Sequence, residues 1–149
     1  MKESIVGKKV FVTGADGFIG SHLVETLVKA GAKVKALVYY NSWNQKGWLN
    51  DVSPEILSEV EIASGDVRDA EFSRTNIDGS EYVFHLASLI AIPYSYIAPR
   101  SYVETNIGGT LNVLQGCRGN SRLIRLVHVS TSEVYGTAQT VPIRETHPL

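Results

Sequence analysis

The sequence has a single cysteine, almost no net charge and no long apolar run. One cysteine, Cys117, excludes a disulfide within the chain and is typical of a reducing compartment. A formal net charge of -1 gives no electrostatic reason to expect nucleic acid or an anionic membrane as a partner. No apolar run approaches the roughly 18 residues that a membrane-spanning helix needs, and residues 1–4 lead into a strand-like stretch without a signal-peptide core. We therefore expect a cytoplasmic protein that binds neither nucleic acid nor a membrane.

The chain does have the length and the apolar patterning of one globular domain, which we expect to span residues 1–149. Short apolar runs predict five strands, at residues 9–13, 34–39, 60–63, 82–87 and 123–130. Helical spacing predicts helices at residues 19–28, 69–77 and 99–117, and residues 88–96 and 136–149 are expected to be loops. Apolar strands that alternate with helices predict an α/β fold: a Rossmann-type doubly wound parallel sheet with strand order 3-2-1-4-5.

Three glycines stand at the join between the first expected strand and the first expected helix. Gly14 can turn sharply off the strand, Gly17 lets a phosphate approach the backbone, and Gly20 lets the helix pack closely on the sheet. The amides of the helix's first turn and its dipole then face the phosphates. The strand before and the helix after make this spacing informative, and it predicts a dinucleotide-binding turn.

The stretch TGADGFIGSHL, at residues 13–23, resembles the signature of the extended short-chain dehydrogenases, the family of nucleotide-sugar epimerases and dehydratases. Further matches follow in the family's order: GDVRD at 65–69, HLAS at 85–88, NIGGT at 106–110 and VSTSEVYG at 129–136. The aromatic stretches near residues 39–49 and 88–96 are similar to dehydratases of the legionaminic-acid type. The resemblance implies a set of cofactor-binding residues: Gly14, Asp16, Gly17, Phe18, Ile19, Gly20, Tyr39, Asn41, Asp66, Val67, Leu86, Ala87, Ser88 and Asn106.

The choice between NAD and NADP depends on the end of the second expected strand. An acidic residue near Val38 would favour NAD, and an arginine just after it would favour NADP. Tyr39 and Tyr40 occupy those places, so neither rule is met. Because no cation is placed for a 2′-phosphate and Asn41 can serve ribose hydroxyls, we expect NAD, with NADP as the alternative.

The stretch after the fifth expected strand carries the information on reaction type. In the family that the chain resembles, Thr131 holds the position that hydrogen-bonds the sugar's 4-hydroxyl, and 4,6-dehydratases have a glutamate at the position of Glu133. In such enzymes oxidation at carbon 4 acidifies the proton on carbon 5, and a glutamate can remove that proton while water leaves carbon 6. Some hexose dehydratases of the family have an aspartate at the position of Ser132, which protonates the departing hydroxyl. The Thr-Ser-Glu of this chain instead resembles the GDP-mannose 4,6-dehydratases, so Glu133 could serve as both base and acid.

The resemblance therefore implies a nucleotide-sugar 4,6-dehydratase, which acts on a nucleotide-diphospho-sugar. A 4-epimerase and a non-catalytic dinucleotide-binding module are the alternatives. The family's catalytic Tyr-x-x-x-Lys pair is absent from the sequence, so we expect the N-terminal part of a longer enzyme, inactive alone and inclined to self-associate as a homodimer. The four histidines show no metal-ligand spacing, and we expect no metal site.

Overall fold

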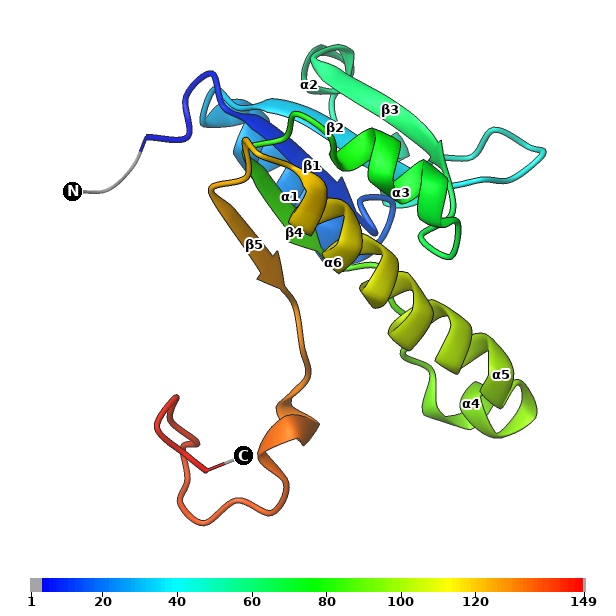
Figure 1. Ribbon diagram of the computed structural model, residues 1–149, viewed down its shortest axis with the longest axis vertical. Coiled ribbons are helices and arrows are strands. Elements are labelled where there is room, and N and C mark those ends of the chain that lie inside the picture. Colours follow the sequence, from blue (N-terminus) through cyan, green and yellow to red (C-terminus); the bar gives the residue numbers. More distant parts are fainter. Residues whose placement is uncertain (1–3, 149) are drawn as a thin grey trace.

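The computed structural model describes residues 4–148, and its centre is one sheet of five parallel strands (Figure 1). The domain expected at residues 1–149 and the loop expected at residues 136–149 include residues 1–3 and 149, which lie outside the described part. The strand order β3-β2-β1-β4-β5 confirms the predicted Rossmann-type topology. The strands are β1 (Lys9–Thr13), β2 (Lys33–Tyr39), β3 (Val60–Gly65), β4 (Tyr82–His85) and β5 (Arg125–His128).

Helices and helical turns connect the strands. They are α1 (Phe18–Lys29), η1 (Gly47–Asp51), α2 (Pro54–Ser58), α3 (Ala70–Ile77), α4 (Ile92–Ile97), α5 (Pro99–Tyr102), η2 (Val103–Gly109), α6 (Thr110–Gly119) and η3 (Ser132–Tyr135). As expected, Asp69 caps α3: its carboxylate accepts the N–H of Phe72 at 3.0 Å. Residues 136–148 form no helix or strand, as predicted.

Two sequence expectations about elements were wrong. Residues 88–96 are not all loop, because α4 begins at Ile92; its proline, Pro93, sits in the first turn, where a missing N–H costs nothing. The helix expected at 99–117 is interrupted by a π-helical stretch, η2, between α5 and α6. Apolar spacing cannot reveal a local change of helical period, and such π-helical turns are frequent at functional sites.

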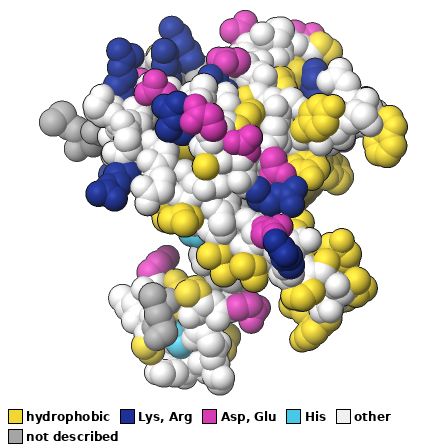
Figure 2. All heavy atoms as spheres, turned by 45° about the vertical axis from the view of Figure 1, so that its right-hand side comes forward, with side chains coloured by type: hydrophobic (Ala, Val, Ile, Leu, Met, Phe, Trp, Pro, Cys, Tyr) yellow, Lys and Arg dark blue, Asp and Glu magenta, His cyan; other side chains and the backbone are white. Residues whose placement is uncertain are grey.

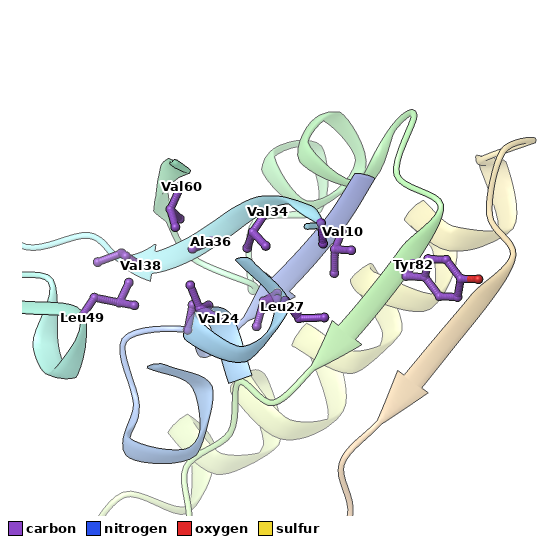
Figure 3. Packing of buried hydrophobic residues seen from close by; sticks show 12 residues of the cluster. Val10, Val24, Leu27, Val34, Ala36, Val38, Leu49, Val60 and Tyr82 are labelled. Atoms are coloured by element: carbon purple, nitrogen blue, oxygen red, sulfur yellow. The ribbon is translucent and has the colours of Figure 1, made fainter. Parts of the chain in front are cut away.

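The side chains of each strand alternate between the two faces of the sheet, and each face has its own core. Val10 and Val12 of β1 point to the face that α1 covers through Val24 and Leu27 (Figure 3). Phe11 points to the other face, where α3 and α6 pack. The second core consists of Phe11, Leu37, Val67, Ile77, Val83, Val113 and Cys117. Helices on both faces explain why the strands read as nearly continuous apolar runs.

One apolar helical face has no cover in the described part of the chain. Val103, Ile107, Leu111 and Leu114 are between 46% and 66% exposed. α4 also has exposed apolar side chains, and hydrophobic groups gather over one end of the molecule (Figure 2). The core-facing side of α6 is instead formed by Val113 and Cys117. The chain after β5 runs away from the sheet, so β5 is an open edge (Figure 1).

Candidate functional site

The glycine turn lies at the carboxyl end of β1, beside the segment that follows β4. Gly14 has a φ of +66°, and a Cβ there would lie 2.8 Å from the backbone nitrogen of Ala87. A Cβ on Gly20 would lie 2.0 Å from the carbonyl oxygen of Gly14, so both positions require glycine. Gly17 is exposed, and a Cβ there would meet only the Gly14 oxygen, at 3.2 Å. The backbone at Gly17 and the first turn of α1 are therefore open to a phosphate, as a dinucleotide-binding turn requires.

A buried hydroxyl and a buried imidazole join β1 to β4 beneath this turn. Thr13 Oγ1 accepts the N–H groups of Leu86 (3.2 Å) and Ala87 (3.1 Å). Its own proton is left for Nδ1 of His85, at 2.7 Å. Burial, and then the nearby ring of His128, lower the pKa of His85 to about 4. His85 is therefore neutral at physiological pH, and the segment after β4 is held by neutral hydrogen bonds.

The same network continues into the π-helical stretch. With Nδ1 accepting, Nε2 of His85 carries the proton and donates to Thr110 Oγ1 at 3.0 Å, and Thr110 donates to the carbonyl oxygen of Asn106 at 2.6 Å. The Asn106 side chain clamps Leu89: its Oδ1 accepts the Leu89 N–H at 2.8 Å, and its Nδ2 donates to the Leu89 carbonyl at 2.9 Å. Asn106 therefore holds the wall of the site in place with both ends of its amide.

A first hollow of about 460 Å³ opens over the carboxyl ends of β1, β2 and β4. This is the crevice where open α/β sheets bind their ligands. Its size, its glycine floor and its mixed polar and apolar wall suit one half of a dinucleotide. The hollow is lined by Gly14, Asp16, Gly17, Leu37, Tyr39, Asp66, Val67, Arg68, Leu86, Ala87, Ser88, Leu89, Tyr94, Ser101 and Thr105.

An ion pair forms one wall of the first hollow. Arg68 donates to Asp66 Oδ2 through Nε (2.9 Å) and Nη2 (2.5 Å), and its Nη2 also contacts the hydroxyl of Tyr39 at 3.3 Å. Burial works to raise the pKa of Asp66, but the hydrogen bonds and charge of Arg68 outweigh burial and lower that pKa. Asn112 donates to the carbonyl oxygens of Val67 (3.0 Å) and Arg68 (2.9 Å) and so fixes the turn that carries the pair.

A second hollow of about 490 Å³ adjoins the first, and the two share Ala87, Ser88 and Leu89. Its walls come from the segment after β4, from α4, from η2 and from the segment after β5. Thr131 Oγ1 accepts the N–H of Glu133 at 3.4 Å at the start of η3, and both side chains are exposed. The remaining lining residues are Ile90, Ile92, Ser95, Tyr102, Asn106, Thr110, His128, Val129 and Ser130.

The two hollows bring together most of the residues singled out from the sequence. Nine expected cofactor-binding residues line the first hollow: Gly14, Asp16, Gly17, Tyr39, Asp66, Val67, Leu86, Ala87 and Ser88. Asn106, Thr131 and Glu133 line the second. Five expected site residues line neither hollow: Phe18, Ile19, Gly20, Asn41 and Ser132.

Two of the residues outside the hollows have other contacts. The side chain of Asn41 is occupied within its own loop, where it donates to the carbonyls of Tyr39 (3.1 Å) and Gln45 (2.8 Å) and accepts the Gln45 N–H (2.9 Å). The ring of Phe18 packs edge-on against Trp48, with 5.3 Å between ring centroids.

Sequence reasoning missed several wall residues. Arg68 lies two positions after Asp66 in the GDVRD stretch, and its charge next to an aspartate expected to bind the cofactor was an available signal. Leu37, Ser101 and Thr105 carry no such signal, because only the fold brings them to the hollow. Among residues 4–148, no group of three His, Cys, Asp or Glu side chains is arranged to hold a metal ion. None of the helices described is both long and apolar enough to cross a membrane.

Comparisons with known proteins agree with this geometry. Residues 11–149 match the family model described as GDP-mannose 4,6 dehydratase. The chain is 34% identical over 143 residues to UDP-glucuronate 4-epimerase 1 of Arabidopsis thaliana, a match that covers 93% of this chain and 33% of the relative. The chain thus spans about a third of that relative's length.

Two solved structures are similar over 95% of the chain, each with a TM-score of 0.80. One is a UDP-N-acetylglucosamine 4-epimerase from Methanobrevibacter ruminantium M1, which is 31% identical; the match covers 44% of that protein's chain. The other is a UDP-glucose 4-epimerase from Bifidobacterium longum, solved in complex with NAD+ and UDP. It is 28% identical, and the match covers 42% of its chain. The chain belongs to the GDP-mannose 4,6 dehydratase family of NAD-dependent epimerases and dehydratases.

Proposed function

We propose that the chain binds NAD across its two hollows, with the adenosine half in the first and the nicotinamide half in the second. The glycine turn, which lines the first hollow, receives the pyrophosphate. The open backbone at Gly17 and the wall shared by the two hollows support this placement. So does the similar structure that was solved with NAD+.

We further propose that the reaction is a nucleotide-sugar 4,6-dehydration. The single observation that carries this proposal is that Thr131 and Glu133 together line the second hollow, where the sugar would meet the nicotinamide. Bound NAD would supply the hydride acceptor for carbon 4 and the hydride donor for carbon 6. Thr131 would hydrogen-bond the sugar's 4-hydroxyl. Glu133 would remove the carbon 5 proton and pass it to the hydroxyl that leaves carbon 6 as water, because Ser132 is too weak an acid for that step. A proton from solvent, taken up by Glu133, would then be returned to carbon 5 as the hydride adds to carbon 6.

A 4-epimerase is the second candidate, because several relatives are named as 4-epimerases of UDP-sugars. Epimerisation needs the 4-hydroxyl contact of Thr131 and a sugar that can turn over within the site. It does not need a base at carbon 5. Glu133 would then be a surface carboxylate of η3 and would take no part in the chemistry.

A product assay in D₂O distinguishes the two reactions. The protein assayed is the full-length gene product, with GDP-mannose and UDP-N-acetylglucosamine offered separately. A dehydratase yields a product lighter by one water that carries solvent deuterium at carbon 5, whereas an epimerase yields an isomer without deuterium there. We expect the first result, and we expect Glu133→Gln to abolish it. An unlabelled isomer from the wild-type protein would contradict the dehydratase proposal.

For the 149-residue chain alone we propose cofactor binding without turnover. None of its seven tyrosines is followed by a lysine four residues later, so no Tyr-x-x-x-Lys pair is present to deprotonate the 4-hydroxyl. NAD binding by calorimetry combined with no sugar conversion is the expected result. Conversion by the purified chain would contradict the proposal. A full-length product that also lacks the pair would favour a non-catalytic NAD-binding module.

We also propose that the protein self-associates as a homodimer. The support is the exposed apolar face of the helix that runs through η2 and α6, defined by Val103, Ile107, Leu111 and Leu114. An exposed apolar helix face is unfavourable in water and is typical of an interface between subunits.

A further inference from the structure

The strand that usually carries the ribose-binding acid carries none in this chain. In Rossmann folds an acidic residue near the end of the second strand accepts hydrogen bonds from the adenosine ribose hydroxyls of NAD. Here β2 ends in Leu37, Val38 and Tyr39, and Tyr40 and Asn41 follow. The Asn41 amide is held within its own loop. An adenosine ribose bound at this end of β2 therefore needs an acceptor from another element.

Asp16 reaches this position from the glycine turn. Its Oδ2 accepts the backbone N–H of Tyr39 at 3.0 Å, which places the carboxylate at the end of β2 although the two residues are 23 positions apart. Both residues line the first hollow. Within residues 4–148 the other oxygen, Oδ1, accepts no hydrogen bond, so it is open to a ligand hydroxyl.

The charges around the first hollow oppose a further negative group. The charged side chains that line it are Asp16, Asp66 and Arg68, which together carry a net charge of -1. The one cation among them, Arg68, already donates twice to Asp66. A phosphate on the ribose 2′-oxygen would therefore approach the Asp16 carboxylate without an unpaired guanidinium to receive it.

We propose that Asp16 binds the adenosine ribose hydroxyls and selects NAD over NADP. This inference rests on the proposed NAD-binding function. The carboxylate accepts hydrogen bonds from the 2′- and 3′-hydroxyls, and it repels a 2′-phosphate at the same place. Asp16 thus takes the role of the acid that β2 lacks, although it comes from the glycine turn.

The test is a calorimetric titration of the protein with NAD+ and with NADP+, compared between the wild type and Asp16→Asn. Asparagine keeps an oxygen for the Tyr39 N–H and removes the charge. We expect the wild type to bind NAD+ about tenfold or more tightly than NADP+, and Asp16→Asn to reduce this ratio of affinities by about fivefold or more. Asp16→Ser, which also lacks the charge, should change the ratio in the same direction. Asp51→Asn removes an exposed carboxylate that does not line the hollow and should leave the ratio within about twofold of the wild type.

The outcomes separate this inference from the function on which it rests. If the wild type binds neither dinucleotide, NAD binding itself is wrong and the inference falls with it. If NAD+ binds but both Asp16 variants keep the wild-type ratio, the proposed function stands and the role of Asp16 is refuted. A wild type that favours NADP+ also refutes it. Should Asp16→Asn fail to fold, the wild type still provides a test. About 0.5 M salt should screen the repulsion between Asp16 and the 2′-phosphate and so reduce the ratio of the NAD+ affinity to the NADP+ affinity. An unchanged ratio would overturn the inference.

Discussion

Acidification should destabilise this fold through one buried side chain, His85. Its ring is 2% exposed and hydrogen-bonded at both nitrogens, and its pKa is lowered to about 4 from 6.5, first by burial and then by His128. The unfolded chain therefore binds a proton at a higher pH than the folded chain does. Stability from this histidine is fully present above pH 6.5 and is lost as the pH falls toward 4. At about pH 5 the loss is about 2 kcal/mol, because a tenfold difference in proton affinity corresponds to about 1.4 kcal/mol.

Urea unfolding at about pH 7.5 and about pH 5, followed by circular dichroism, measures this loss. Carboxylates also begin to titrate near the lower pH, so the comparison needs a variant without the imidazole. His85→Asn should be less stable than the wild type at neutral pH, but it should lose about 2 kcal/mol less on acidification. His22→Gln removes an exposed histidine and should keep the wild-type pH dependence. Equal losses in the wild type and His85→Asn would refute the reasoning.

Three further predictions concern packing and association. Gly20→Ala should lower the free energy of unfolding in urea by about 2 kcal/mol or more, because its Cβ would lie 2.0 Å from a carbonyl oxygen. A Cβ on Gly119 would have nothing within 4 Å, so Gly119→Ala should be neutral or stabilising. Equal effects of the two substitutions would contradict the packing argument. Burial raises the pKa of the Cys117 thiol to about 11. At about pH 8 a thiol reagent should therefore react slowly with the folded protein and rapidly with the protein in denaturant. A rapid reaction without denaturant would show that the thiol is accessible. Sedimentation velocity should show a concentration-dependent dimer that Ile107→Glu with Leu111→Glu converts to monomer, and a monomeric wild type would exclude the proposed interface.

The central strands β1, β2 and β4 could be predicted because most of their side chains are buried, whichever face of the sheet they point to. Val10, Phe11 and Val12 are all buried, so burial produced an uninterrupted apolar run that needs no knowledge of the neighbours. Strand ends were less predictable. The strand expected at 82–87 stops at His85, and just beyond it the backbone N–H groups of Leu86 and Ala87 bond to the Thr13 hydroxyl. The partner of these N–H groups is a side chain more than 70 residues away in the sequence, so no local pattern reveals the contact.

The candidate site was predictable where backbone geometry demands one residue type. Gly14 and Gly20 have contacts that exclude any side chain, so the sequence carries their role directly. Side-chain contacts across the fold were not predictable in the same way. Asp16 was among the expected cofactor-binding residues, but its bond to the end of β2 depends on how the turn folds back. Asn41 was expected to reach the ribose, yet local hydrogen bonds to its own loop compete for its amide.

The central claim is that NAD binds across the two hollows at the carboxyl end of the sheet. Titration of the isotope-labelled chain with NAD+, followed residue by residue through its amide NMR signals, tests this claim most directly. Shifts should concentrate at the glycine turn, at the end of β2, at residues 66–68 and at residues 86–89. The amides of residues 60–62 at the start of β3 and of residues 55–58 in α2, which line neither hollow, should not move. No shifts at millimolar NAD+, or shifts gathered away from the glycine turn, would contradict the account.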